Sequence, residues 1–241
     1  MKAFLLAAGL GTRFSPGAKG DPKPMARVAG VPLLEHALRR VAAFGVREVF
    51  INLHHRPEVI RGYFGDGRKW GVEVRYSHEP RLLGTAGAVR NLAREFDGTF
   101  IVYYTDNLCS FDLAAMAARH AERGALATIL VSESYDRLAG GVLECAGDAR
   151  VLRFLEKPSG TEDAARLENG GVYLCEPRVI DWIPPEGPSD FGRDVFPALL
   201  KSGEPVYCHR AEGFVRGIDT PERYRELERA ISEGTLQLGQ V

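Results

Sequence analysis

Short apolar runs alternate with amphipathic stretches in the first half of the chain, and this alternation most constrains the fold. The expected strands are the short apolar runs, at residues 4–8, 48–53, 72–77 and 99–106. The expected helices carry apolar residues at helical spacing, at residues 33–44, 57–64 and 85–96. Parallel strands need such crossover helices, which cover both faces of the sheet. The pattern therefore predicts an α/β protein, a Rossmann-like three-layer αβα arrangement with a mostly parallel mixed sheet.

The second half of the chain mixes further strands with helices. Strands are expected at residues 126–132, 141–145, 151–156, 170–174 and 205–209, and helices at residues 112–123 and 191–201. Thr220 is suited to cap a final helix, with Pro221 at its first position and Glu222 in its first turn. No linker, repeat or low-complexity segment divides the 241 residues, so one domain is expected.

Composition excludes several classes of protein. A net charge of −1 and a pI near 6.6 argue against a nucleic-acid-binding surface. No run approaches the roughly 20 apolar residues of a membrane-spanning helix. The apolar start is short and leads directly into a stretch rich in Pro, Gly and Lys, which favours a buried strand over a signal peptide. The four cysteines are at least 30 residues apart, which predicts reduced thiols in a cytoplasmic protein.

A glycine-rich loop follows the first expected strand, in the segment FLLAAGLGTRFSPGAKGDPKPM. It lacks the G-x-x-x-x-G-K-[ST] pattern of a P-loop, and Phe14 stands where a dinucleotide-binding loop needs a third Gly or an Ala. Gly9 and Gly11 allow the backbone to approach an anion closely, and Arg13 and Lys23 are suited to clamp a polyphosphate. A surface loop rich in turn-forming residues is the alternative that this segment leaves open.

The loop and six later segments resemble those of the sugar-1-phosphate nucleotidyltransferases, the nucleoside-diphosphate-sugar pyrophosphorylases. The loop is similar to the family's signature, with Arg13 and Lys23 ten residues apart. The later segments, in the family's order, are EPRLLGTAGAV, Asp106 at a strand end, EKP, NGGVYL, DFGRDVFP and GIDTPERY. The chain resembles the mannose- and heptose-1-phosphate guanylyltransferases most. The resemblance implies the nucleotide-diphospho-sugar transferase fold and transfer of a nucleotidyl group from an NTP to a sugar 1-phosphate, with release of pyrophosphate.

The resemblance also implies which residues carry the chemistry. Arg13 would hold the β- and γ-phosphates, Lys23 would bridge the α-phosphate and the incoming phosphate, and Asp106 would bind Mg²⁺, the expected cofactor. The predicted NTP-binding residues are Leu6, Ala8, Gly9, Gly11, Thr12, Arg13, Glu79, Gly84 and Thr85. The predicted residues for the sugar phosphate are Asn107, Gly141, Glu156, Lys157, Asn169 and Gly170.

The second predicted metal ligand is Asp219, which lies where the chain departs from the family's pattern. Relatives read W-x-D-I-G-T-P, but here the Gly and the Asp have exchanged places, as Gly217 and Asp219. Residues two apart on an extended strand point to the same face, so Asp219 is placed to reach a metal that the usual Asp would bind. The alternative is that Asp219 is only a helix-start residue beside Thr220.

Glu79 is the residue from which the base is predicted. A carboxylate only accepts hydrogen bonds, and guanine offers two adjacent donors, so Glu79 favours GTP unless it faces water just before Pro80. Thymidylyl-, uridylyl- and cytidylyltransferases of the same family are alternatives. A non-catalytic nucleotide-sugar-binding regulator is another. A nicotinamide-dependent oxidoreductase is a third alternative. Phe14 argues against it, because a dinucleotide-binding loop needs a Gly or an Ala at that position.

Each part of the chain is expected to bind a different ligand. Residues 1 to about 110 would bind the NTP, about 111–220 the sugar phosphate, and about 221–233 would form the C-terminal helix. The expected partners are an NTP and a sugar 1-phosphate, with no nucleic acid and no membrane. The sequence leaves open the sugar and the oligomeric state, including a homo-oligomer.

Overall fold

The structure is a computed structural model that describes residues 1–9, 11, 20–133, 141–156 and 167–238. The chain folds into two compact units. Unit 1 contains Met1–Leu82, Tyr103–Ser110 and Gly213–Val241, and unit 2 contains Leu83–Val102 and Phe111–Glu212. The division falls inside strand β6 (Phe100–Tyr104). None of the described helices is long and apolar enough to cross a membrane.

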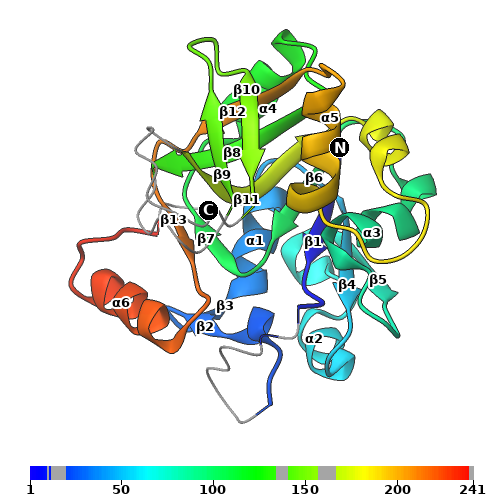
Figure 1. The fold of residues 1–241 in the computed structure, drawn as a ribbon. Coiled ribbons are helices and arrows are strands. Elements are labelled where there is room, and N and C mark those ends of the chain that lie inside the picture. Colours follow the sequence, from blue (N-terminus) through cyan, green and yellow to red (C-terminus); the bar gives the residue numbers. More distant parts are fainter. Residues whose placement is uncertain (10, 12–19, 134–140, 157–166, 239–241) are drawn as a thin grey trace. The chain divides into compact units, whose positions relative to one another are not determined.

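Three parallel strands form the centre of unit 1 (Figure 1). They are β1 (Lys2–Leu6), β4 (Glu48–Leu53) and β5 (Glu73–His78). Five of the six residues of β4 are buried, whereas only Val74 and Ser77 are buried among the six residues of β5. A middle strand of a parallel sheet is covered on both faces, which explains the continuous burial of β4 from Val49 to Leu53.

The helices of unit 1 are α1 (Leu33–Ala43), α2 (Pro57–Phe64) and α6 (Pro221–Ser232). In α1, Leu34, Leu38 and Val41 are fully buried, and burying each such side chain stabilises the fold by about 1.5–3 kcal/mol. Helix α2 begins with a proline, whose fixed φ suits a first helical position, and ends at Gly65, whose φ of +54° suits glycine.

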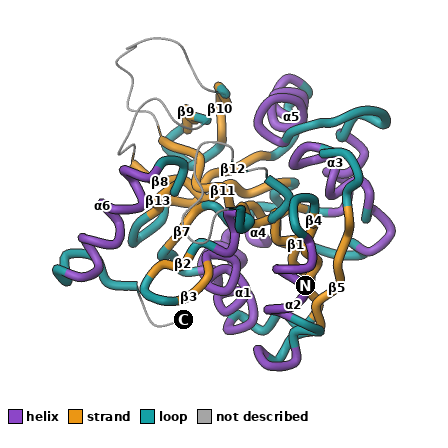
Figure 2. Tube along the Cα trace, turned by 90° about the horizontal axis from the view of Figure 1, so that it is seen from below, coloured by secondary structure: helices purple, strands orange, loops and turns teal. Residues whose placement is uncertain are grey.

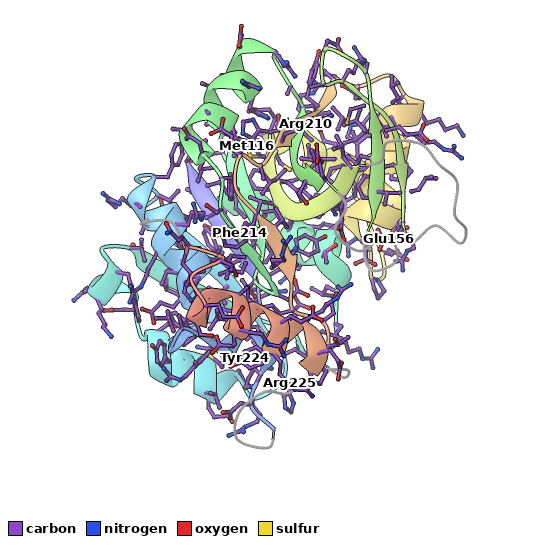
Figure 3. All side chains as sticks on the ribbon, turned by 90° about the vertical axis from the view of Figure 1, so that its left-hand side faces the viewer. Met116, Glu156, Arg210, Phe214, Tyr224 and Arg225 are labelled. Atoms are coloured by element: carbon purple, nitrogen blue, oxygen red, sulfur yellow. The ribbon has the colours of Figure 1, made fainter. Side chains whose placement is uncertain are left out.

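Two short antiparallel ribbons complete unit 1. Strand β2 (Arg27–Val28) pairs with β3 (Val31–Pro32), and β7 (Asn107–Cys109) pairs with β13 (Val215–Gly217). Helix α6 packs beside them through Leu227, and the Tyr224 hydroxyl donates to the carbonyl of Arg27 at 2.6 Å. Figure 2 shows the course of α6, and Figure 3 shows Tyr224 on this helix. Apolar contacts and this hydrogen bond thus join segments about 200 residues apart.

Unit 2 has a mixed set of strands. They are β8 (Ala127–Glu133), β9 (Val142–Cys145), β10 (Val151–Leu155), β11 (Leu167–Cys175) and β12 (Val206–Arg210). Strand β12 pairs with β8 in parallel, whereas β11 with β8, β11 with β9, and β10 with β9 are antiparallel pairs. Its helices are α3 (Gly84–Asn91), α4 (Leu113–Glu122) and α5 (Phe196–Lys201). The prediction of an α/β fold with a mixed sheet is confirmed.

An aromatic cluster forms part of the core of unit 2. Tyr173 of β11 lies 4.9 Å from Phe196 and 5.4 Å from Phe191, measured between ring centroids. Phe154 of β10 lies 5.4 Å from Phe196. Such pairs add about 0.5–1.5 kcal/mol each beyond burial. The cluster therefore fixes β10, β11 and the start of α5 against each other.

The predicted elements are present, with shifted ends. Strand β4 and helix α2 match their predicted bounds to the residue. The helix expected at residues 85–96 ends at Asn91, and a separate 3-10 turn (Ala93–Glu95) follows. The helix expected at residues 191–201 begins as a π-helical turn (Phe191–Val195). The strand expected at residues 99–106 ends at Tyr104, which leaves Asp106 in a turn.

Candidate active site

One lysine ammonium joins two carboxylates in unit 1. The Nζ of Lys23 lies 3.0 Å from Oδ2 of Asp106 and 3.0 Å from Oδ1 of Asp219. The Lys23 side chain is 10% exposed, whereas those of Asp106 and Asp219 are 39% and 22% exposed. The predicted catalytic lysine and both predicted metal ligands therefore meet at one point, with the carboxylates open to solvent.

The β7–β13 ribbon brings the two carboxylates together. Asn107 of β7 pairs with Gly217 of β13, and the N–H of Ile218 donates to the carbonyl of Asp106 at 3.0 Å. Asp106 precedes one strand of the ribbon, and Asp219 follows the other. Asn107, predicted to bind the sugar phosphate, thus lies in unit 1 beside the carboxylate pair.

A proline-flanked turn positions Lys23. Lys23 opens a 3-10 turn (Lys23–Met25) between Pro22 and the buried Pro24. The N–H of Ala26 donates to the Lys23 carbonyl at 2.9 Å, which closes the turn. The two prolines restrict the backbone on both sides of Lys23. The main chain that carries the Lys23 side chain therefore has little conformational freedom.

Gly217 lies beside the carboxylate of Asp219. A Cβ added to Gly217 would lie 3.7 Å from Oδ2 of Asp219 and 3.2 Å from Oδ1 of Asn107. A side chain at position 217 would therefore start within contact distance of the Asp219 carboxylate. The second oxygen of Asp219 lies 3.5 Å from Nη1 of Arg223, in the first turn of α6. Asp219 thus makes contacts beyond those of a helix-start residue, although Thr220 does cap α6.

The donor set of this cluster fits Mg²⁺. Mg²⁺ is bound in proteins by one or two carboxylates together with substrate phosphates, and Asp106 and Asp219 supply two carboxylates that face one cationic centre. In the described part of the chain, no group of three or more His, Cys, Asp and Glu side chains is arranged to hold a metal ion. The pair accordingly suits a cation whose remaining ligands come from phosphates and water.

The carboxylate of Glu79 is turned into unit 1. Glu79 is 2% exposed, so the alternative that it faces water is wrong. Its Oε1 accepts a hydrogen bond from Nδ2 of Asn52 at 2.8 Å, and Oδ1 of Asn52 accepts from the N–H of Ala7 at 2.7 Å. Asn52 therefore connects Glu79 to the segment that leads into the glycine-rich loop. Contact between Glu79 and a base stays a prediction.

The described part of the glycine-rich loop starts at the end of β1. The carbonyl of Leu6 accepts from the hydroxyl of Thr105 at 2.7 Å, and Ala8 is buried. Gly9 has open space where a Cβ would point, and Gly11 has a φ of +59° that suits glycine. Three predicted site residues lie outside the described residues: Thr12, Arg13 and Lys157.

The start of α3 is bound by another segment of unit 2. The N–H and the hydroxyl of Thr85 both donate to Oδ1 of Asp190, at 3.0 and 3.1 Å. Gly84 has a φ of +75°, and a Cβ there would lie 2.4 Å from the carbonyl oxygen of Ser189. The positive φ and the absence of a Cβ therefore both require glycine at this position. The predicted NTP contacts of Gly84 and Thr85 stay predictions.

Three residues predicted for the sugar phosphate meet in unit 2. Gly141 precedes β9, Glu156 follows β10 (Figure 3), and the N–H of Asn169 donates to the carbonyl of Gly141 at 2.9 Å. A Cβ added to Gly141 would lie 3.1 Å from Oε2 of Glu156 and 2.7 Å from the Phe154 ring. A Cβ added to Gly192 would lie 2.5 Å from the same carboxylate oxygen. Two glycines thus leave the space in which Glu156 lies.

Asn169 and Gly170 are held by the strands around them. Nδ2 of Asn169 donates to the hydroxyl of Tyr173 at 2.8 Å, and its Oδ1 accepts from the N–H of Gly171 at 3.0 Å. A Cβ added to Gly170 would lie 2.9 Å from the carbonyl oxygen of Leu130 in β8. The glycine at position 170 therefore makes room for a neighbouring strand, and its contact with a sugar stays a prediction.

Residues 2–232 match the protein family described as nucleotidyl transferase. The chain belongs to the nucleotidyl transferase family. The match covers nearly the whole chain and confirms the resemblance on which the site residues were predicted. The match also includes the three distant segments of this nucleotidyl transferase that supply Lys23, Asp106 and Asp219.

Two curated relatives match most of the chain. It is 37% identical over 222 residues to a UTP–glucose-1-phosphate uridylyltransferase of Synechocystis sp., with 86% of this chain and 57% of the relative covered. It is 36% identical over 225 residues to the mannose-1-phosphate guanylyltransferase of Mycobacterium tuberculosis, with 92% and 62% covered. This nucleotidyl transferase thus spans about 60% of the length of these relatives.

A solved structure confirms the fold. The crystal structure of HddC from Yersinia pseudotuberculosis superposes with a TM-score of 0.79 at 23% identity, and covers 95% of this chain and 99% of HddC. At this identity the likeness shows the fold, which is the predicted nucleotide-diphospho-sugar transferase fold, and not the substrate.

Sequence reasoning missed several residues that complete the two clusters. Asn52, which orients Glu79, is a polar residue between the apolar residues Ile51 and Leu53 of β4, and a polar side chain inside such a run is the signal that could have found it. Gly192 and Asp190 lie in the recognised segment DFGRDVFP without an assigned role. No sequence pattern indicated Arg223 as a site residue, because its contact with Asp219 depends on how the last helix begins.

Proposed function

We propose that this nucleotidyl transferase moves a nucleotidyl group from an NTP, with GTP favoured, to a sugar 1-phosphate and releases pyrophosphate. The observation that carries the proposal is the convergence of Lys23, Asp106 and Asp219 from three distant segments. Both relatives described above are named as nucleotidyltransferases of sugar 1-phosphates, one uridylyl and one guanylyl. The whole chain's activity is inferred from these two facts together.

The reaction needs no protein nucleophile. A phosphate oxygen of the sugar 1-phosphate is already anionic; it forms a bond to the α-phosphorus, and the bond from that phosphorus to the oxygen bridging to the β-phosphate breaks. Catalysis then consists of positioning and charge neutralisation. An ammonium has three N–H donors, of which Lys23 uses two for Asp106 and Asp219, so a third can serve a phosphate oxygen. Arg13 is proposed to hold the leaving pyrophosphate.

Asp106 and Asp219 are the residues that would hold Mg²⁺. When bound, Mg²⁺ would supply positive charge to the phosphates and so favour the developing negative charge of the reaction. The two carboxylates also fix the Lys23 ammonium, which keeps this cation in place before substrates bind. Because the β7–β13 ribbon sets both carboxylates through backbone pairing, their spacing does not depend on a flexible loop.

Unit 2 is proposed to bind the sugar. Glu156 is a hydrogen-bond acceptor beside two glycines, and hydroxyl groups of a sugar are donors that a carboxylate can orient. Lys157, which follows it in the sequence, is proposed to bind the phosphate of the sugar 1-phosphate.

Glu79 supports GTP over UTP. Its carboxylate can only accept hydrogen bonds, and guanine presents two adjacent donors where uracil presents one. Asn52 holds Oε1 of Glu79, which fixes the orientation of the carboxylate. The two relatives act on different bases at nearly equal identity, so the base has to be tested directly. All four cysteines are free thiols, which supports a cytoplasmic location for the reaction.

A matrix of substrates tests the proposal. GTP, UTP, dTTP, CTP and ATP are each combined with mannose 1-phosphate, glucose 1-phosphate and a heptose 1-phosphate in the presence of Mg²⁺, and pyrophosphate release is followed. We expect release that requires both substrates and Mg²⁺, with GTP the preferred NTP. Release that is fastest with UTP or dTTP would overturn the GTP preference alone. Binding of a nucleotide sugar without any turnover across the matrix would favour a regulatory protein instead.

A further inference from the structure

A groove in unit 1 is lined by residues that have no part in the proposed nucleotidyl transfer. Its volume is about 700 Å³, within the range of small-molecule sites in proteins, about 300–1,000 Å³. The last turns of α1 supply Arg39 and two alanines, and a 3-10 turn (Arg68–Trp70) supplies Lys69 and Trp70. Arg47 and Gly71 complete the lining. The groove is therefore a candidate for a second binding site.

The lining of the groove is positively charged. Arg39, Arg47 and Lys69 are cations, and the other four lining residues are uncharged. Nη1 of Arg47 donates to two backbone carbonyls, at 3.1 and 3.2 Å, and Nζ of Lys69 lies 4.9 Å from the centroid of the Trp70 ring. Among the residues that the structure describes, neither Arg47 nor Lys69 is paired with a carboxylate. A lining with unneutralised cations and no carboxylate attracts anions.

The carboxylate of Glu35 fixes two of the lining side chains. Glu35 is 2% exposed, and its Oε1 accepts from Nε of Arg39 at 2.7 Å and from Nε1 of Trp70 at 3.1 Å. Its Oε2 accepts from the hydroxyl of Tyr63 at 2.6 Å, and the Tyr63 and Trp70 rings stack with their centroids 6.1 Å apart. Side chains that are fixed before a ligand arrives lose little conformational entropy when it binds. Glu35 also offsets the charge of Arg39, so two positive charges remain in the groove.

All three cations keep hydrogen-bond donors for a ligand. Arg39 uses Nε and Nη2 for Glu35, which leaves its Nη1, and Arg47 uses Nη1, which leaves its Nε and Nη2. The ammonium of Lys69 has three N–H donors. Guanidinium and ammonium groups are the usual partners of phosphate oxygens in proteins. Two positive charges also match a phosphate monoester, which carries about −1.5 to −2 at pH 7.

We propose that this groove binds an organic phosphate. Arg39, Arg47 and Lys69 hold the phosphate, and the uncharged part of the molecule lies against Trp70 and the two alanines. An apolar or aromatic surface with a few placed polar groups is the usual composition of a small-molecule site. Binding here is independent of nucleotidyl transfer, because none of the groove residues takes part in that reaction.

Titration of a protein with one tryptophan tests the proposal. The chain has two tryptophans, so Trp182→Phe leaves Trp70 as the only one. Glucose 6-phosphate is added without NTP or Mg²⁺ while the fluorescence of Trp70 is followed, and equilibrium dialysis of the labelled compound against the wild-type protein is the second measurement. We expect saturable binding with a Kd below about 1 mM, weaker binding of inorganic phosphate, and none of glucose.

Lys69→Ala and Arg68→Ala locate the binding site. Each removes one cation from the same 3-10 turn, but Lys69 lines the groove, whereas Arg68 is 88% exposed and pairs with Asp66 at 3.2 Å. The Kd for glucose 6-phosphate should rise about tenfold in Lys69→Ala and stay within about twofold of the wild type in Arg68→Ala. Lys23→Ala, in the proposed catalytic cluster, should bind as the wild type does.

Three results would overturn the proposal. They are no saturable binding to the wild-type protein in dialysis, binding of inorganic phosphate as tight as that of glucose 6-phosphate, and weakening by Lys23→Ala but not by Lys69→Ala. The last would place the bound molecule in the proposed catalytic cluster. Failure of nucleotidyl transfer in the substrate matrix is a separate outcome, because this binding is measured without turnover.

Discussion

The two units place their predicted site residues by different physical means. In unit 1, charged side chains from distant segments converge: the ammonium of Lys23 and the carboxylates of Asp106 and Asp219. In unit 2, Glu156 lies in space that Gly141 and Gly192 leave free. The first cluster should be sensitive to removal of charge, and the second to addition of atoms. This difference makes the two halves of the proposed function separable by mutation.

Removal of one carboxylate in unit 1 should have the largest effect. Asp219→Asn keeps the shape of the side chain but removes the charge that faces Lys23 and Arg223. We expect the rate of pyrophosphate release to fall about 100- to 1000-fold, as when one charge-stabilising group is lost from a transition state. Initial rates at saturating Mg²⁺ measure the effect.

Asp66→Asn is the matched control for that variant. Asp66 also lies in unit 1, but its side chain is 64% exposed and is paired with Arg68. Its loss should leave the rate within about twofold of the wild type, because exposed ion pairs contribute little. Full Mg²⁺-dependent activity in Asp219→Asn would show that Asp106 carries the metal alone.

Addition of one methyl group in unit 2 should produce the next largest effect, on stability. Gly84→Ala places a Cβ 2.4 Å from the carbonyl oxygen of Ser189 at a backbone φ of +75°. We expect the free energy of unfolding to fall by about 2–3 kcal/mol, from backbone strain and overpacking together. Urea unfolding followed by circular dichroism measures it. Gly98→Ala, where no atom lies within 4 Å of the added Cβ, should change stability far less.

A second added methyl group should act on substrate binding rather than on the fold. The Cβ of Gly192→Ala would lie 2.5 Å from Oε2 of Glu156 and would displace this carboxylate. We expect the KM for the sugar 1-phosphate to rise about tenfold, or about 1.4 kcal/mol, with the KM for the NTP unchanged. Gly147→Ala, in the turn between β9 and β10, has open space at the added Cβ and is the control. An equal rise in both KM values would contradict the proposal that this part of unit 2 binds the sugar 1-phosphate and not the NTP.

The smallest expected effect is the loss of stability when a helix cap is removed, and each unit offers one such cap. Asp112 accepts from the N–H of Ala115 at 2.9 Å at the start of α4, whereas Thr220 accepts from the N–H of Arg223 at 3.4 Å at the start of α6. Asp112→Ala should reduce stability by about 1 kcal/mol and Thr220→Ala by about 0.5 kcal/mol, because the second hydrogen bond is longer. Thermal unfolding of both variants, measured side by side, gives the ranking. A larger loss for Thr220→Ala would reverse the order that hydrogen-bond length predicts.

Periodicity in the sequence was enough to predict the long elements. Strand β4 is a short, mostly apolar run, and helix α2 begins at a proline and is followed by a glycine. The bounds of both elements were therefore predicted to the residue. Strand β1 ends at Leu6, before the predicted Ala8, because the N–H of Ala7 bonds to the Asn52 side chain. The ribbons of two or three residues carry no period, and only the segment of Gly217 and Asp219 was taken as extended; its strand, β13, ends at Gly217.

The division into two units had no sequence signal for a physical reason. Each unit is assembled from segments that alternate along the chain, so no linker marks the boundary. The candidate site was predictable where motifs named a residue, as for Lys23 and Asp106. Its supporting contacts, such as Arg223 with Asp219 and Asn52 with Glu79, depend on tertiary packing and were not predicted.

Transfer of label from the α-phosphate of the NTP tests the central claim most directly. The wild-type protein is incubated with Mg²⁺, mannose 1-phosphate and GTP labelled at the α-phosphate, and the products are separated by chromatography. The proposed function predicts that the label enters a guanosine diphosphate sugar and that unlabelled pyrophosphate is released in equal amount. Labelled GDP with free phosphate, or no conversion with this or any other NTP and sugar 1-phosphate, would contradict nucleotidyl transfer.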